Sequence, residues 1–457
     1  MIFSSIEFLL WFLPIFLIVY GITPRKYRNL TLLVGSIVFY AMGDVRYLPL
    51  LMISILCNYF LGLHLAKRSP KTLWRKKLLL ILTLGANLAV LLWFKDWGGS
   101  AGLPLGISFY TFQILSYQID VYRGEVSREY SFLKFATYVI MFPKLISGPI
   151  TRYGDISDSL TERTFTVRGL EDGMKLFILG LAAKVLLADR VGILWHEVQV
   201  TGFESISTPL AWLAAIAYSM EIYFDFWGYS LMAMGLGRMM GIELPANFRR
   251  PYMARSVRDF YRRWHMTLGQ WFCRYVYIPL GGSRQGELRT IFNLLVVWML
   301  TGIWHGAGWN FLFWGLWFAF FLILEKLFLG DILESVPKVF GRIYTLAVVL
   351  ISWVFFALES PGEILAYLQA MFGMNGIGPV NSLAMFLCNE YLVLLVIALV
   401  ACLPLGSRLV HALKSSKTGP AMALYRLGEK VIPAVLLLLS VAYIVDASYN
   451  PFLYFRF

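Results

Sequence analysis

Residues 290–306 read Thr-Ile-Phe-Asn-Leu-Leu-Val-Val-Trp-Met-Leu-Thr-Gly-Ile-Trp-His-Gly, a run without Asp, Glu, Lys or Arg that ends on a histidine and a glycine. An apolar run of this length is typical of a transmembrane helix. Comparable runs recur along the whole chain, and we predict spans near residues 2–22, 29–43, 48–66, 77–97, 104–121, 171–189, 208–227, 290–306, 311–328, 343–358, 390–404 and 431–448. Some are short enough to be tilted helices, half-helices or re-entrant segments, so we expect about 11 or 12 crossings.

The composition indicates the same class of protein. Hydrophobic residues make up 59% of the chain, charged residues only 15%, and the mean hydropathy is +0.67. Soluble domains carry about 25% charged residues. The first run lacks the basic start and the small-residue cleavage site of a signal peptide, so we expect it to be retained as a span. The predicted fold class is therefore all-α, in a polytopic integral membrane protein.

The net charge of +13 would suggest a nucleic-acid partner in a soluble protein, but here the basic residues lie in loops between spans. Arg25, Lys26 and Arg28 follow the first run, and a second cluster occupies residues 67–77. The positive-inside rule places both loops in the cytoplasm and the N-terminus outside. It assigns the same inner face to Arg238–Arg289, which holds ten arginines and three acidic residues. We therefore expect the protein to have a lipid bilayer as partner and to bind no nucleic acid.

Arginine clusters also bind phosphates and carboxylates. The Arg238–Arg289 segment either sets topology alone or also holds an anionic donor, such as a coenzyme or an acidic carrier protein. The candidate donor-binding residues within it are Arg249, Arg250, Arg262 and Arg263.

Familiar catalytic and metal-binding motifs are absent from the sequence. There is no P-loop, no Gly-x-Ser-x-Gly elbow and no zinc signature, and the four cysteines (Cys57, Cys273, Cys388 and Cys402) fall at no metal-ligand spacing. We therefore expect no metal site and no disulfide framework, and the chemistry has to come from polar residues in the membrane segments.

Two histidines, His265 and His305, lie among tryptophans and glycines at the edges of apolar stretches. Ionisable side chains at membrane depth cost about 2.5 to 3.5 kcal/mol on insertion scales and usually face a cavity or a pathway. The alternative is that each histidine only hydrogen-bonds a neighbouring helix. The other three histidines, His64, His196 and His411, lack such surroundings and are expected to be structural or loop residues.

Two further stretches interrupt apolar sequence. Ser108–Gly124 contains Gln113 and other polar side chains, which either face a cavity or hydrogen-bond neighbouring helices. Phe142–Pro149 contains two prolines and a glycine, so it cannot run as a straight helix. We expect a re-entrant element there.

Two carboxylates, Glu221 and Asp225, lie four residues apart and therefore share one helix face. Carboxylates within a span need partners. An arginine such as Arg250 or Arg262, or a histidine, is a candidate partner. The two carboxylates either form a buried ion pair or take part in catalysis, and Asp225 is also a candidate tunnel residue.

Together these motifs resemble the membrane-bound O-acyltransferase family, and within it the branch that O-acetylates bacterial polysaccharides. The near-invariant histidine of the family matches His305, and an upstream asparagine-or-histidine position matches His265. The sequence departs from the family pattern at Leu231 and Cys273–Arg274, where relatives commonly carry aspartate. The resemblance covers Phe3–Ser5, Ser108–Gly124, Phe142–Arg152, Tyr223–Gly282, Thr301–Trp314 and Tyr449–Phe457.

The resemblance implies a ring of helices and re-entrant segments around a central tunnel that joins a cytoplasmic donor site to an outer acceptor site. It implies a single membrane domain over residues 1–457, with N-terminal helices at 1–104, a catalytic core at 105–330 and C-terminal helices at 331–457. The implied enzyme lies in the bacterial inner membrane, binds no cofactor, and transfers acetyl groups from acetyl-CoA to an extracytoplasmic polysaccharide of the alginate type. Its implied partner is a secreted or membrane-anchored acetyltransferase of the SGNH type.

The residue types fit this chemistry. Moving an acetyl group from a thioester to a hydroxyl needs a base, and a histidine with a pKa of about 7 is suited to remove the proton. His305 is the candidate base, and His265 is the candidate for orienting the donor or stabilising the developing oxyanion. The residues expected to line the passage beside them are Trp304, Gly306, Trp309, Asn310, Asp225 and Gln113.

Three alternatives remain open at the level of sequence. A D-alanyl transferase acting on teichoic acid would use a carrier protein as donor. A lipid transporter or proton-coupled transporter would also contain intramembrane His, Asp and Glu, although we find no inverted repeat. The third alternative is a scaffold that only anchors an extracellular acetyltransferase.

Overall fold

The computed structural model describes residues 1–65, 73–97, 102–378, 381–416 and 419–446. Helices are the regular secondary structure of these residues, which contain no β-strand, and this confirms the predicted all-α class. Two features of the sequence lie outside the described residues: the basic residues 67–72 and the C-terminal motif Tyr449–Phe457. The described chain forms two compact units, one from 1–181 with 229–246 and the other from 182–228 with 247–446.

Unit 1 is built from short and long helices around α5, whose side chains are almost all buried. Helix α5 begins after Gly106, which has a φ of +71° and packs against the backbone carbonyl of Leu145, so no other residue fits there without strain. The helices of unit 1 are α1 (Leu13–Ile22), α2 (Arg28–Asp44), α3 (Leu48–Leu65), α4 (Leu73–Leu92), α5 (Ile107–Arg123), α6 (Phe132–Ile140), α7 (Phe142–Leu145), α8 (Tyr153–Thr161), most of α9 (Val167–Ala182) and the part of α11 (Thr208–Met239) from Tyr229 onward.

The proline-interrupted stretch of unit 1 is not a straight helix. Helix α6 ends at Ile140, α7 makes a single turn, and the chain then continues without regular structure to Arg152. Residues 142–150 are all buried. The interrupted backbone is as expected, and its re-entry from a membrane face stays a prediction.

Unit 2 contains the sequence motifs around both histidines. Its helices are α10 (Asp189–Thr201), the part of α11 up to Gly228, α12 (Val257–Tyr261), α13 (Met266–Phe272), α14 (Glu287–His305), α15 (Trp309–Leu324), α16 (Gly330–Ser335), α17 (Lys338–Ala357), α18 (Pro361–Met371), α19 (Ser382–Cys402), α20 (Leu405–Ser415) and α21 (Gly419–Asp446). Segments Ala183–Ala188 and Cys273–Tyr277 are π-helical.

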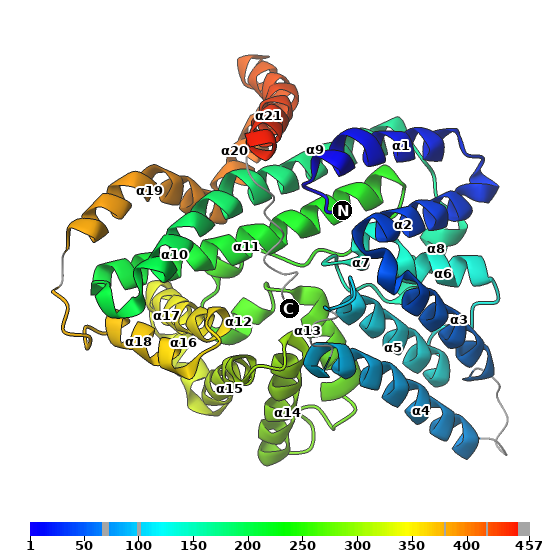
Figure 1. Cartoon of the computed structure of the whole chain (residues 1–457), viewed down its shortest axis with the longest axis horizontal. Coiled ribbons are helices and arrows are strands. Elements are labelled where there is room, and N and C mark those ends of the chain that lie inside the picture. The colour runs from blue at the N-terminus through cyan, green and yellow to red at the C-terminus, as the bar shows by residue number, and fades with distance from the viewer. Residues whose placement is uncertain (66–72, 98–101, 379–380, 417–418, 447–457) are drawn as a thin grey trace. The chain divides into compact units, whose positions relative to one another are not determined.

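Helices α14 and α15 of unit 2 form a hairpin joined by residues 306–308 (Figure 1). Their close packing depends on two glycines. A side chain at Gly302 would meet the carbonyl of Phe311, and one at Gly315 would meet the carbonyl of Trp298. This small-residue contact fixes the end of α14, where His305 lies.

Seven helical stretches within the described residues are long and apolar enough to cross a membrane, in agreement with a polytopic membrane protein. One of them, Arg25–Leu65, contains two of the predicted spans, since α2 and α3 are separated only by the turn Val45–Tyr47. Other predicted spans fall on shorter helices, such as Glu7–Ile22, or on α11, which carries two carboxylates. The number of crossings therefore stays a prediction.

Candidate functional site

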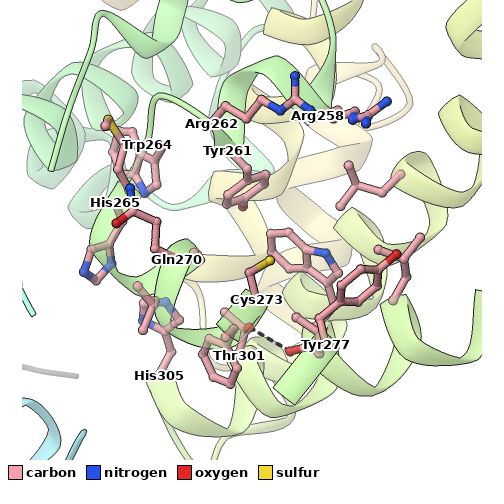
Figure 2. Close-up of a pocket in the computed structure, with 18 of the residues that line it drawn as sticks. Arg258, Tyr261, Arg262, Trp264, His265, Gln270, Cys273, Tyr277, Thr301 and His305 are labelled. Carbon is pink, nitrogen blue, oxygen red and sulfur yellow. Dashed lines mark hydrogen bonds between the residues drawn. The ribbon is translucent and has the colours of Figure 1, made fainter. Parts of the chain in front are cut away.

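Unit 2 contains a cavity of about 400 Å³ to which both predicted histidines contribute. Figure 2 shows His265 and His305 on one side of the cavity and Arg258 and Arg262 on another. The remaining lining residues are mostly apolar or aromatic: Tyr261, Trp264, Met266, Leu268, Gly269, Gln270, Phe272, Cys273, Tyr277, Leu294, Val297, Trp298, Thr301, Trp314 and Leu322. All of them belong to unit 2.

His265 lies immediately before α13 in a left-handed backbone conformation, with a φ of 40°. This conformation is uncommon for residues other than glycine, and local hydrogen bonds maintain it. The backbone N–H of Met266 donates to the carbonyl of Asn247 at 2.9 Å, and the hydroxyl of Thr267 donates to the Asn247 side chain at 2.6 Å. The imidazole packs edge-on against Phe226, with ring centroids 4.7 Å apart.

The buried position of His265 decides its charge. Burial lowers the pKa of the His265 imidazole to about 3, so the ring is neutral at physiological pH. A neutral imidazole has one N–H donor and one acceptor nitrogen. It can therefore orient a carbonyl or a hydroxyl, but it does not supply a positive charge.

His305 is the last residue of α14 and is 4% exposed. Aromatic rings surround its imidazole: the centroids of Trp304, Trp314 and Phe356 lie 4.8, 4.9 and 5.2 Å away. These rings exclude water from most of the imidazole and fix its orientation, while the residue still contributes to the cavity wall. This environment suits a base that acts on a substrate hydroxyl inside the cavity.

The four arginines predicted to bind a donor are not together. Arg262 lines the cavity, whereas Arg249, Arg250 and Arg263 are not among its lining residues. Arg263 pairs with Asp259, with its Nε 2.8 Å from Oδ1, and Arg250 donates to the hydroxyl of Ser407 at 2.5 Å. The second arginine of the cavity is Arg258, which was not among the four predicted donor-binding residues.

The residues expected to shape a passage next to His305 have different environments. Trp304 is buried against the His305 ring, and Gly306 leaves no room for a side chain because the Phe311 ring lies against it. Trp309 is 72% exposed, while Asn310 is 2% exposed. Within the described part of the chain, the side-chain amide of Asn310 makes no hydrogen bond.

Gln113 and Asp225 also have well-defined partners. Gln113 lies in unit 1, where its Oε1 accepts a hydrogen bond from the fully buried Lys144. The Lys144 ammonium also lies 4.2 Å from the centre of the Tyr138 ring.

Asp225 forms an ion pair with a lysine, which the expectation of an arginine or histidine partner did not include. Its Oδ1 lies 2.7 Å from Nζ of Lys184, which also contacts Asp189 at 2.6 Å. Lys184 comes from a π-helical turn about 40 residues upstream, and sequence spacing gives no sign of such a pairing.

Two residues of the cavity, Arg258 and Thr301, could have been found from helical spacing. Arg258 lies four residues before Arg262, and Thr301 lies four residues before His305, so each pair shares one side of its turn or helix. Trp298 and Trp314 gave no comparable signal, because aromatic residues occur throughout this sequence.

The fold and the cavity define a polytopic membrane protein with a largely apolar site that holds two histidines and two arginines. Residues 37–361 match the model of the membrane-bound O-acyltransferase family, and the chain belongs to this family. It is thus a membrane-bound O-acyltransferase.

Similarity to individual proteins extends over most of the chain. The sequence is 37% identical to the probable alginate O-acetylase AlgI of Pseudomonas putida over 100% of both chains. It is 34% identical to the peptidoglycan O-acetyltransferase of Helicobacter pylori over 82% of this chain and 81% of that protein. It is 28% identical to the teichoic acid D-alanyltransferase of Streptococcus thermophilus over 49% of this chain and 57% of that protein.

Proposed function

We propose that this enzyme transfers acetyl groups from a cytoplasmic thioester, acetyl-CoA, across the bacterial inner membrane for O-acetylation of an extracytoplasmic polysaccharide of the alginate type. The observation that carries the proposal is that both histidines and two arginines line the same cavity. The full-length similarity to a probable alginate O-acetylase supports the choice of acetyl and of the polymer.

In the proposed reaction, His305 accepts the proton of the acceptor hydroxyl while the hydroxyl oxygen bonds to the thioester carbonyl carbon. The carbon–sulfur bond then breaks, and the proton leaves with the thiol. A positioned general base contributes about 10²- to 10⁴-fold to such a step. Neutral His265 donates its N–H to the carbonyl oxygen or orients the donor, which stabilises the charge that develops there.

The donor's phosphates interact in this proposal with Arg258 and Arg262, because guanidinium groups bind phosphate in a bidentate geometry. Arg249, Arg250 and Arg263 lie in the same arginine-rich segment, Arg238–Arg289, and contribute to its positive electrostatic potential. The apolar walls formed by residues such as Leu294 and Val297 suit the uncharged arm of the donor. The acceptor hydroxyl belongs to the polysaccharide or to a secreted or membrane-anchored acetyltransferase of the SGNH type that passes the acetyl group on.

D-Alanyl transfer to teichoic acid is the second candidate, because the chain is also similar to a teichoic acid D-alanyltransferase. The two functions differ in the donor. A D-alanyl transferase would require an acidic carrier protein, whereas the proposed enzyme accepts acetyl-CoA directly.

The first test compares three alanine variants in acetyl transfer, with His196→Ala as the control because His196 is exposed and outside the cavity. His305→Ala should abolish transfer, and His265→Ala should reduce it less, since an orienting group can be partly replaced by water or neighbours. Thermal unfolding of each purified variant confirms that the fold is intact. Near-normal transfer by a folded His305→Ala variant would overturn the mechanism.

The second test measures transfer of radiolabelled acetyl from acetyl-CoA in inverted membrane vesicles. Arg258→Gln and Arg262→Gln should raise the KM for acetyl-CoA, and exposed Arg284→Gln is the matched control. If transfer ignores acetyl-CoA and depends on a carrier protein, the D-alanyl candidate is the better one.

A further inference from the structure

Helix α20 is a short helix between two long apolar ones. Helix α19 ends at Cys402, α20 spans Leu405–Ser415, and α21 begins at Gly419. Both α19 and α21 are long and apolar enough to cross a membrane. A short segment that connects two spans lies at the membrane surface, so the surroundings of α20 are the boundary between lipid and water.

The residues of α20 separate into two arcs when they are placed at 100° per residue. The apolar arc contains Leu405, Leu409, Val410, Ala412 and Leu413, and the polar arc contains Ser407, Arg408, His411, Lys414 and Ser415. No polar side chain falls within the apolar arc. Complete segregation of this kind is typical of helices that lie in the plane of a membrane interface.

Among the described residues, the apolar arc of α20 stays exposed. Leu405, Leu409 and Val410 are 47%, 61% and 50% exposed, and no residue of the helix is buried. Burying these side chains in lipid would remove this apolar surface from water.

The charge around α20 matches an anionic surface. Residues 404–430 contain five Lys or Arg and one acidic residue, which assigns the segment to the cytoplasmic side. On the polar arc, Ser407 accepts a hydrogen bond from Arg250, so the polar arc contacts the arginine-rich segment Arg238–Arg289. The cytoplasmic leaflet carries anionic lipids that attract such clusters.

We propose that α20 lies in the plane of the cytoplasmic membrane surface, with its apolar arc in the acyl-chain region and Arg408 and Lys414 on the headgroups of anionic phospholipids. The contact of Ser407 with Arg250 then ties the arginine-rich segment to the membrane surface. This inference does not depend on the acyl donor or on the acceptor.

The depth of α20 can be measured on the full-length protein in nanodiscs, after replacement of the four native cysteines. Nitroxide labels are placed on Leu409→Cys and His411→Cys, with Leu392→Cys in α19 as the lipid reference and Arg284→Cys as the water reference. The label at 409 should collide with oxygen, as the lipid reference does, and the label at 411 should collide with a water-soluble nickel complex. Equal behaviour of the labels at 409 and 411 would overturn the proposal, whether both match lipid or both match water.

The lipid preference is tested with a fluorophore on His411→Cys in nanodiscs that contain brominated phosphatidylglycerol or brominated phosphatidylcholine. Phosphatidylglycerol should quench more strongly, and this preference should weaken by about fivefold for each charge removed in Arg408→Gln/Lys414→Gln. Arg284→Gln/Arg289→Gln removes the same charge outside α20 and should leave the preference unchanged. Equal quenching by the two lipids with unmodified Arg408 and Lys414 would refute their contact with anionic headgroups. An equal loss of the phosphatidylglycerol preference in both double variants would also refute it.

Discussion

At the scale of single residues, His265 combines a strained backbone with a buried ring. A left-handed conformation costs roughly 1–2 kcal/mol for residues with a Cβ, but asparagine tolerates it better than most. We expect His265→Ala to be less stable than His265→Asn by about 1 kcal/mol, although both variants lose the contact with Phe226. Chemical unfolding in detergent measures the difference. Equal stability of the two variants would show that the backbone at this position is not strained.

The lowered pKa of His265 also makes stability depend on pH. Burial lowers the pKa of the imidazole to about 3 in the folded protein, against about 6.5 in an unfolded chain. Between about pH 3 and 6.5 the unfolded chain therefore binds more protons at this group than the folded protein. Stability falls as the pH drops through this window. His265→Asn should flatten the dependence of the unfolding midpoint between pH 7 and pH 5. An unchanged slope in this variant would assign the pH dependence to other groups.

Asn310 is a buried amide without a hydrogen bond in the described part of the chain, which costs about 1–3 kcal/mol. Asn310→Leu has a similar volume and removes this cost, so we expect a higher unfolding temperature. If the amide interacts with substrate, acetyl transfer should fall in the same variant. A loss of both stability and activity would instead indicate a structural hydrogen bond to water.

At the scale of structural elements, the ion pair of Lys184 and Asp225 joins the π-helical turn 183–188 to α11 within unit 2. The two side chains are 3% and 2% exposed. Lys184→Met leaves Asp225 charged and buried and should destabilise the protein by about 3–5 kcal/mol. Lys184→Met/Asp225→Leu should recover part of this loss, because Asp189 still lacks its lysine partner. Thermal unfolding of the single and double variants measures these changes in stability. If the double variant is no more stable than Lys184→Met, the pair does not act as a unit.

The elements that could be predicted from sequence are those with a local signal. The apolar run of α14 and the position of His305 at its end follow from residues 290–306 alone, and so does the interruption at Phe142–Pro149. The partner of Asp225 could not be predicted, because Lys184 approaches it through tertiary packing and a π-helical turn. The prediction from sequence grouped Arg249, Arg250, Arg262 and Arg263. The cavity instead holds Arg262 with Arg258, a pair that helical spacing could have indicated.

At the scale of the whole molecule, the distribution of Lys and Arg predicts that Arg238–Arg289 faces the cytoplasm and the N-terminus faces outward. Arg255 is exposed and lies in this segment. We expect Arg255→Cys, in a cysteine-free background, to react with a membrane-impermeant maleimide only in inverted vesicles. Labelling from outside intact cells would reverse the topology.

Every residue that lines the cavity belongs to the same compact unit. Rigid-body motion of that unit therefore preserves the spacing of the two histidines and the two arginines. Substitutions elsewhere in the chain leave this constellation in place, provided that unit 2 still folds. Sequence change in unit 1 is thus compatible with a constant arrangement of these four side chains, a form of modularity that separates variation in one unit from the cavity of the other.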